Sequence, residues 1–261
     1  MTFEWFSEFW RYRELLYFLA WRDVKIRYKQ AFLGASWAII QPLFTMIIFT
    51  LFFGRLAKVP SDGIPYPLFS YSALVPWTYF SSSLSQAGNS LVTNSTLLTK
   101  VYFPRVLLPA ASILSGMLDF LVGSAFLVIM MVYYHARPGW SLLLAPFFIF
   151  LVILLALGIS MLLAAMNVRF RDVKYALPFL IQIWLFVTPI IYPVTFLPAK
   201  YRGILSFNPM AGIIEGFRAS VFSSAHMDWG LVGISSGVTL FFLIFGALYF
   251  RKTEKIFADI V

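Results

Sequence analysis

Long stretches without a charged residue restrict what this chain can fold into. A transmembrane helix needs about 20 apolar residues to cross the hydrocarbon core of a bilayer, and an ordinary soluble domain carries about 25% charged residues. Here only 12% of the 261 residues are charged and 61% are hydrophobic. The sequence therefore predicts an all-α polytopic membrane protein with six transmembrane helices, over residues 33–54, 66–90, 106–134, 141–166, 176–192 and 229–250.

The basic residues indicate how these spans are oriented. Six spans bring both termini to one side of the membrane, and short cytoplasmic loops are enriched in Lys and Arg. The two termini and the loops on their side carry 14 of the 20 Lys and Arg residues, which predicts that both termini are cytoplasmic. Because the basic residues lie between apolar runs and not along one soluble face, the net charge of +9 indicates membrane topology, and we set nucleic acid aside as a partner.

The first 30 residues mix aromatic and charged side chains. This pattern favours an amphipathic helix over residues 1–30 that lies in the membrane interface, ahead of a six-helix transmembrane domain over residues 31–261. Charges interrupt every apolar run before the first span, so we do not expect a cleavable signal peptide. The segment either sets the orientation alone or docks a partner. Its basic residues at the inner surface are Arg22, Lys25, Arg27 and Lys29.

The inner loop between the second and third spans contains a candidate short helix. It runs from about Asn94 to Tyr102, with Asn94 or Ser95 as its cap, and Pro104 stops it because proline disfavours helix at the residue before it. Such a helix would lie across the cytoplasmic end of the bundle. The alternative for this loop is a simple polar turn.

The outer region 192–228 is the longest break between spans and contains a second candidate helix. Asn208 can cap a short re-entrant or surface-lying helix that has Pro209 in its first turn. Glu215 and Arg218 are three residues apart, so they share one face and can pair. We interpret this region as an external gate, and a passive cap is the alternative.

Catalytic signatures are missing from the sequence. There is no cysteine, the two histidines are isolated, and neither a zinc motif nor a nucleophile elbow is present, so we expect no catalytic and no metal site. The chain also lacks a phosphate-cradling loop, so ATP and Mg²⁺ would have to be bound by another polypeptide. Asp119 is the one acid inside a predicted span, and we favour a structural or inter-subunit polar anchor over a proton carrier for it.

Aromatic residues are abundant, with 29 Phe, 13 Tyr and 8 Trp. Many of them fall near predicted span ends, where an interfacial aromatic belt is the usual explanation. Alternatively, some line a path for sugars, whose C–H faces stack on aromatic rings while their hydroxyls meet Ser, Thr and Asn. The second and fifth spans offer that mixture, and the candidates are Trp77, Tyr79, Phe80, Trp184 and Phe186.

Four sequence segments resemble a known family when they are taken in order. They are "RDVKIRYKQAFLGASWAIIQPL" from Arg22 to Leu43, "NVRFRDV" from Asn167 to Val173, "TPIIYP" and "FNPM". Together they resemble the ABC-2 type transmembrane subunits that export polysaccharides of the O-antigen, capsule and teichoic-acid kind. The resemblance covers nearly the whole chain.

The resemblance implies a transport subunit and not an enzyme. It implies a homodimer in the bacterial inner membrane, in contact with membrane lipids, that associates with two copies of a separate cytoplasmic ATPase. The implied substrate is a lipid-linked polysaccharide. The paired first and fifth spans would open the path. There are three alternatives: an ABC-2 exporter of teichoic acid, lipids or drugs, an ion-coupled secondary transporter, and a membrane-embedded transferase. A coupling helix that docks the ATPase would comprise Asn94, Ser95, Thr96, Leu97, Leu98, Lys100, Val101, Tyr102 and Phe103, with Arg169, Arg171, Asp172 and Lys174 beside it or at the inner mouth.

Overall fold

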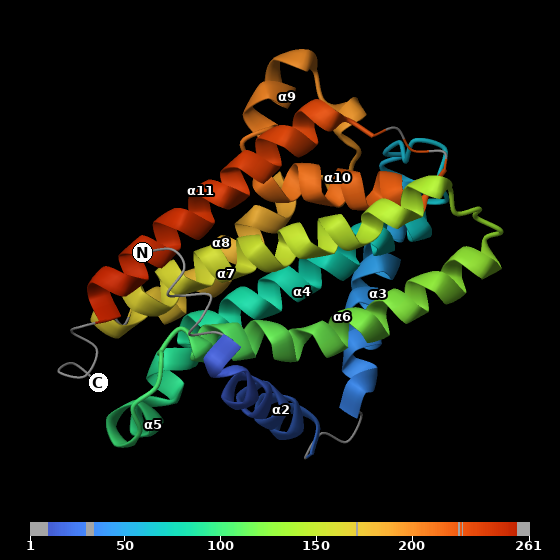
Figure 1. Ribbon diagram of the computed structural model, residues 1–261. Helices are drawn as coiled ribbons and strands as arrows, with labels where there is room; N and C mark the ends of the chain where they lie inside the picture. Colours follow the sequence, from blue (N-terminus) through green and yellow to red (C-terminus); the bar gives the residue numbers. More distant parts are fainter. Residues whose placement is uncertain (1–9, 30–33, 171, 224, 226, 255–261) are drawn as a thin grey trace.

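The computed structural model describes residues 10–29, 34–170, 172–223, 225 and 227–254, and all regular structure within these ranges is helical. Residues 1–9, most of the "KQAFL" junction and Arg171 lie outside the described residues. Figure 1 shows long helices that run side by side, with a short helix at each end of the bundle. The elements are α2 (Arg13–Lys29), η1 (Gly34–Ser36), α3 (Trp37–Phe49), η2 (Thr50–Leu56), α4 (Tyr66–Thr93), α5 (Ser95–Lys100), α6 (Leu107–Tyr133), η3 (Trp140–Leu144), α7 (Ala145–Arg169), α8 (Val173–Val187), η4 (Val194–Phe196), α9 (Ala199–Leu205), α10 (Pro209–Val221) and α11 (Trp229–Glu254).

Four helical segments are long and apolar enough to cross a membrane: Trp37–Leu56, Leu107–Tyr133, Trp140–Arg169 and Trp229–Glu254. The segments expected at 66–90 and 176–192 are also helical, as α4 and α8, but they differ in character. The 28 residues of α4 include no charged residue but many hydroxyl side chains, which lower its hydropathy, and α8 has only 15 residues.

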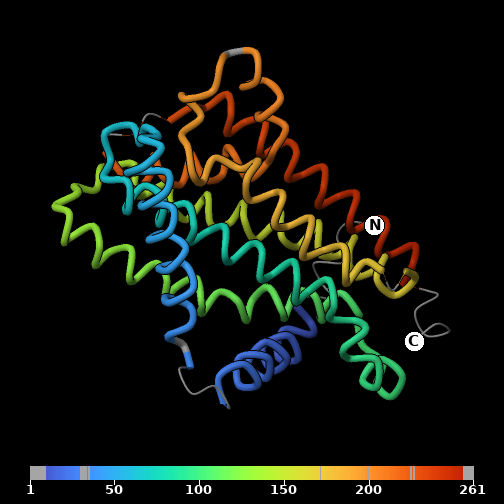
Figure 2. The backbone as a smooth tube through the Cα atoms, turned by 180° about the vertical axis from the view of Figure 1, so that it is seen from behind, coloured from blue at the N-terminus to red at the C-terminus, as the bar shows by residue number. Residues whose placement is uncertain are grey.

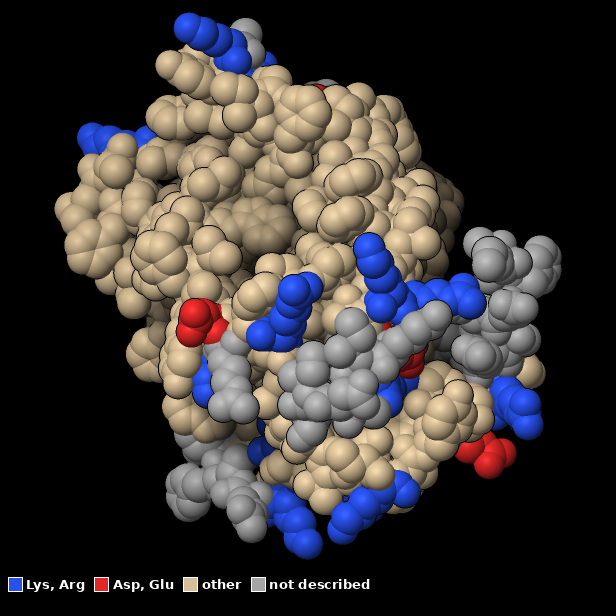
Figure 3. Space-filling view, turned by 90° about the vertical axis from the view of Figure 1, so that its left-hand side faces the viewer, with Lys and Arg blue, Asp and Glu red and all other residues tan. Residues whose placement is uncertain are grey.

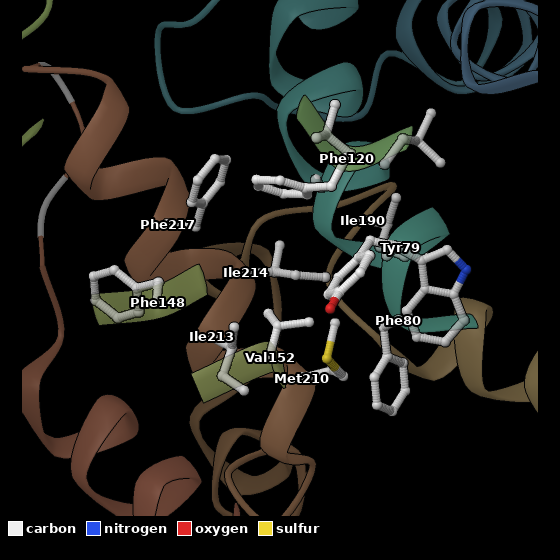
Figure 4. Packing of buried hydrophobic residues seen from close by; sticks show 14 of the residues in the cluster. Tyr79, Phe80, Phe120, Phe148, Val152, Ile190, Met210, Ile213, Ile214 and Phe217 are labelled. Carbon is white, nitrogen blue, oxygen red and sulfur yellow. The ribbon is translucent and has the colours of Figure 1, made fainter. Parts of the chain in front are cut away.

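Helix α4 is the centre of the molecule. It packs against α6, α7, α3, α10 and α8, and most of its side chains are buried. Hydroxyl groups of α4 bond mostly to backbone carbonyls one turn earlier, as Thr78 does with the carbonyl of Leu74 at 2.8 Å, so most of the donors of this polar helix are satisfied although it is buried. Figure 4 shows how Met210, Ile213 and Ile214 of α10 fill the space between aromatic side chains of α4 and α7.

Small residues bring α7 and α11 into backbone contact. A Cβ atom added to Gly246 would lie 2.0 Å from the carbonyl oxygen of Gly158, and one added to Gly158 would lie 2.6 Å from the backbone nitrogen of Leu243. Close approach through glycine is typical of membrane helix pairs. Ser160, which the sequence places in the same helix without catalytic partners, is fully buried there.

Two short helices, α9 and α10, lie between α8 and α11 along the chain, and α10 corresponds to the helix expected after Asn208. The Asn208 side chain accepts a hydrogen bond from the backbone N–H of Met210 at 3.1 Å, which confirms the predicted cap, and α10 starts at Pro209. Helix α8 ends at Val187, five residues before the expected boundary, because the chain extends at Thr188 ahead of Pro189.

The opposite end of the bundle holds a second hydrophobic cluster. It joins Leu19 of α2, Leu98 of α5, Leu107 of α6, Val168 of α7 and Phe250 of α11. Figure 3 looks at this end of the molecule and shows Lys and Arg side chains gathered over its lower half. Exposed basic residues at the ends of the surrounding helices include Lys100, Arg169, Lys174, Arg251 and Lys252.

Candidate functional site

Helix α5 projects from the basic end of the bundle as a short separate turn (Figure 1). It is shorter than predicted, since Val101 is already extended, and the Asn94 side chain does not cap it. The amide of Asn94 instead donates to the carbonyl of Ser90 at 2.8 Å, which closes the end of α4. Of the two predicted cap residues, Asn94 and Ser95, Asn94 occupies the cap position of α5, but the side-chain capping bond is absent.

The α5 segment has an anchored side and an open side. Leu98 and Phe103 are buried in the second hydrophobic cluster, so they hold the segment to the bundle and are not available to a partner. Tyr102 is 95% exposed, and Lys100 and Val101 beside it are exposed as well. Because tyrosine is enriched at the centres of protein interfaces, and Val101 and Lys100 are exposed beside it, this surface is suited to docking. The exposed members of the predicted coupling set are Thr96, Lys100, Val101 and Tyr102, while Asn94, Ser95 and Leu97 are half-buried.

The basic loop between α7 and α8 lies at the same end, and Asn167 holds it there. Asn167 is buried, and its amide donates to the carbonyl of Gly88 at 3.1 Å and to the side chain of Asn89 at 2.9 Å. Arg169, Asp172 and Lys174 are exposed around this anchor, and Arg171 lies outside the described residues. The motif thus joins a structural asparagine to a cluster of exposed charges.

Helix α2 runs beside the first half of α6, and both apolar and polar side chains of α2 face the bundle. Arg27 pairs with Asp119 of α6 and donates to Gln86 of α4, and Tyr28 also donates to Asp119. The side chains of Arg27 and Asp119 are each 23% exposed. Asp119 therefore anchors helices within one chain. The outward side of α2 carries exposed apolar side chains, including Tyr17, Phe18, Trp21 and Ile26.

The predicted inner-surface residues on α2 are consequently divided. Arg22 pairs with Asp23 at 2.8 Å and Arg27 faces α6, whereas Lys25 and Lys29 are exposed. An amphipathic helix on a membrane surface would be expected to point its charges toward water. The packing reverses this arrangement for Arg27, because Asp119 offers it a carboxylate inside the bundle.

A polar cleft of about 450 Å³ lies between α3, α4, α6 and α8. Figure 2 shows the face on which α3 crosses the other helices. Hydroxyl and amide side chains line the cleft on the α4 side, and Trp37 and Pro42 of α3 and Pro178 and Ile181 of α8 form the opposite walls. Polar groups inside a membrane bundle are typical of a substrate path. The polar residues of its α4 wall are Thr78, Ser81, Ser82, Ser85 and Gln86.

A second polar groove of about 590 Å³ continues from this cleft to the α5 end. Arg27, Ser85 and Gln86 line both spaces, and the second groove extends along Asn89 and Thr93. The two spaces therefore meet at these three shared residues. Together they form a polar track on α4 from the basic end toward the middle of the bundle.

The aromatic residues proposed from sequence as path-lining lie in different environments. Trp77, Tyr79 and Phe80 are buried in the core around α4, and only Tyr79 also borders the polar cleft. The Trp184 ring packs edge-on to Phe80, with 5.2 Å between the ring centroids. Phe186 is exposed on α8.

The segment that contains α9 and α10, called the outer segment below, bonds to the core through Trp184 and Arg218. The indole N–H of Trp184 donates to the side-chain oxygen of Asn208 at 2.9 Å. Arg218 is only 2% exposed, pairs with Glu215 at 3.0 Å as predicted, and lies 3.7 Å above the ring of Phe69. Burial raises the pKa of the Glu215 carboxyl, and the charge of Arg218 opposes that rise.

Sequence comparisons with known proteins identify the family of the chain. The family model described as ABC-2 type transporter matches residues 14–222. The chain belongs to the ABC-2 type transporter family. It is 29% identical over 255 residues to an O-antigen export system permease protein of Myxococcus xanthus, covering 97% of each chain, and 28% identical to one of Klebsiella pneumoniae, covering 95% of each. A polysialic acid transport protein of Escherichia coli is 24% identical and is covered over 91% of its length.

The family match extends from α2 to the end of α10 and so includes α5, the polar track and the outer segment. In this ABC-2 chain, the sequence patterns did not identify three residues that hydrogen-bond between helices: Gln86 and Ser115, which both accept from Arg27, and Asn167, which donates to Gly88. Their polarity inside or beside uncharged runs was a usable signal. The glycines at the α7–α11 contact gave no such signal, because many glycines occur in the chain and only the packing distinguishes these two.

Proposed function

We propose that this chain is the membrane-spanning permease subunit of an ATP-driven exporter that moves lipid-linked polysaccharide, such as O-antigen, from the cytoplasm across the bacterial inner membrane. The observation that carries the proposal is the nearly full-length similarity to O-antigen export permeases. The polar track on α4 supports it, since sugar hydroxyls require hydrogen-bonding groups inside the bilayer.

The proposal includes six membrane crossings, by α3 with η2, α4, α6, α7, α8 and α11. Helix α4 reaches about 42 Å at 1.5 Å per residue and has no charged residue, so it can cross despite its lower hydropathy. The 15 residues of α8 span only about 22 Å. The extended segment after Val187 and the outer helices would complete that crossing. The basic end would face the cytoplasm, and both termini would lie there.

A homodimer would form through α3 and α8. Helix α3 buries only three of its 13 residues and α8 only one of its 15, although both are apolar. Both border the polar cleft, so a second copy would cover their exposed faces and close the cleft into a path. The outward apolar side chains include Phe44, Ile48, Phe179, Leu180 and Ile183.

Two copies of a separate cytoplasmic ATPase would dock on α5 and supply ATP hydrolysis with Mg²⁺. Leu98 and Phe103 fix the segment to α6, α7 and α11, so movement of the docked ATPase would be transmitted into the bundle. Tyr102 would enter the partner. The exposed charges of the α7–α8 loop would lie beside it or at the inner mouth. The outer segment around Asn208 and Arg218 would act as the external gate.

The test is co-purification of the full chain with a co-expressed ABC ATPase, followed by an ATPase assay with and without lipid-linked glycan. We expect a stable complex whose ATP turnover responds to glycan. Tyr102→Ala should weaken association at least about tenfold, because interface tyrosines contribute about 2 kcal/mol. Tyr133→Ala, which removes an exposed tyrosine at the other end of α6, is the matched control. A chain that binds no ATPase would refute the proposal.

An ion-coupled carrier is the alternative from another class. It would require an acid in a span that exchanges ions, and the acid at the middle of α6 is held by Arg27 and Tyr28. This pairing favours the anchor role. Exporters of teichoic acid, lipids or drugs would use the same polar cleft and the same α5 segment. The response of ATP turnover to lipid-linked glycan therefore decides between these cargoes and polysaccharide.

A further inference from the structure

An apolar groove between α6 and α7 remains outside the function proposed above. Its volume is about 800 Å³, and it lies at the end of the bundle away from α5. Figure 1 shows α6 and α7 diverging toward the loop that connects them. Along the helices, Ser124 is the single polar residue among those that line the groove. Phe217 and Val221 of α10 form its floor.

The mouth of this groove has the opposite character. His135 and Arg137 line it, both are exposed, and residues 134–145 contain no acid. The mouth is also fixed in place. The backbone N–H of Ala136 donates to the carbonyl of Met131 at 2.9 Å, and the hydroxyl of Ser223 donates to the carbonyl of Arg137 at 3.1 Å.

Aromatic side chains place this mouth at the membrane–water boundary. Trp140 is 93% exposed and Tyr133 is also exposed, and both residue types concentrate at the level of lipid headgroups. The groove therefore begins at headgroup depth and runs into the hydrocarbon region. A basic mouth over an apolar channel matches a molecule with an anionic head and a hydrocarbon tail.

We propose that this groove binds one anionic phospholipid of the outer leaflet, with an acyl chain between α6 and α7 and its phosphate at Arg137. The leaflet rests on the orientation proposed above, whereas the binding itself does not. The acyl chain would contact Phe217 and Val221, so the lipid would support α10. Val128 lines the wall of the groove, while its neighbour Ile129 is equally exposed on α6 but does not line it.

The test measures lipid bound to the full chain by native mass spectrometry, with palmitoyl-oleoyl phosphatidylglycerol and phosphatidylcholine as competing probes. We expect one retained phosphatidylglycerol per chain and a preference of about fivefold, which corresponds to ~1 kcal/mol for a basic residue near the lipid surface. Val128→Trp should abolish retention by placing an indole across the path of the acyl chain. Arg137→Gln should abolish the preference for phosphatidylglycerol without removing the bound lipid.

Two variants serve as matched controls. Ile129→Trp adds the same indole on the adjacent face of α6, and Lys200→Gln removes an exposed positive charge elsewhere in the outer region. Both should retain lipid as the unmodified chain does. Equal retention by the Val128→Trp chain, or equal binding of the two probes by the unmodified chain, would overturn the proposal. If Val128→Trp does not fold, Arg137→Gln decides the outcome, because its side chain lies on an exposed loop. Failure to bind an ATPase would leave these results unaffected.

Discussion

Removing Arg27 should destabilise the protein more than removing its partner Asp119. Asp119 lies twelve residues after the start of α6, about 18 Å along the helix. A charge at the centre of a membrane helix costs roughly 2.5 to 3.5 kcal/mol on insertion scales. Arg27→Ala leaves that carboxylate without its cation. Since the side chain is partly exposed to the cleft and keeps its bond from Tyr28, we expect a loss of about 2 kcal/mol in unfolding free energy.

Asp119→Ala should cost less, about 1 kcal/mol, because Arg27 retains hydrogen bonds to Gln86 and Ser115. In the double variant the two losses should not add, and the coupling energy should be about 1 to 2 kcal/mol. The assay is reversible unfolding of the purified chain in mixed micelles, followed by circular dichroism. Arg22→Ala is the control, since its pair with the adjacent Asp23 lies outside this network.

If the loss in the double variant equals the sum of the two single losses within about 0.5 kcal/mol, then Arg27 and Asp119 do not stabilise each other, which would refute the argument. An equal loss for Arg22→Ala and Arg27→Ala would also contradict it. In that case a general requirement for positive charge on α2 would explain the result without the network.

Three further predictions follow from packing and hydrogen bonding, and thermal unfolding in detergent checks each of them. Gly246→Ala should destabilise the protein by about 1 to 3 kcal/mol, because the added methyl group overlaps α7 at the α7–α11 contact. Gly237→Ala, in open space on the same helix, should be neutral or stabilise the protein by up to about 1 kcal/mol. Equal effects of the two substitutions would contradict the contact. Arg218→Ala should cost about 3 to 5 kcal/mol, because it removes a buried guanidinium that bonds to the carbonyls of Phe69 and Pro189 and leaves the half-buried Glu215 carboxylate without its cation. A loss below about 1 kcal/mol would exclude that explanation. Trp184→Phe should cost about 1 kcal/mol through the lost bond to Asn208, and an unchanged melting temperature would argue against it.

The sequence predicted best where one physical requirement dominates. Long uncharged runs have to be helices in a bilayer, because no other local structure satisfies all backbone hydrogen bonds there. The expected spans at 106–134 and 229–250 accordingly correspond to α6 and α11 within four residues at each end. The cap at Asn208 and the Glu215–Arg218 pair were equally predictable, since both depend on neighbours within one helical turn.

Prediction was weaker where several partners compete for one side chain. Asn94 has the correct position for a cap of α5, yet its side chain donates to the carbonyl of Ser90 at the end of α4. The aromatic candidates for a path mostly fill the core, since periodicity alone does not distinguish the buried side of α4 from its cleft side. From its position in the sequence, Arg27 was expected at the inner surface, but in the folded chain it pairs with Asp119.

By itself, the sequence determined that this chain is a helical membrane protein, where its helices lie along the chain, and to which family it is similar. These properties depend on local composition and on residues close in sequence. The tertiary structure alone decided which polar residues meet: Arg27 with Asp119 across 92 positions, Asn167 with Gly88 across 79, and Trp184 with Asn208. The reason is physical, because a buried polar group must find a partner, and the identity of that partner depends on how the helices pack.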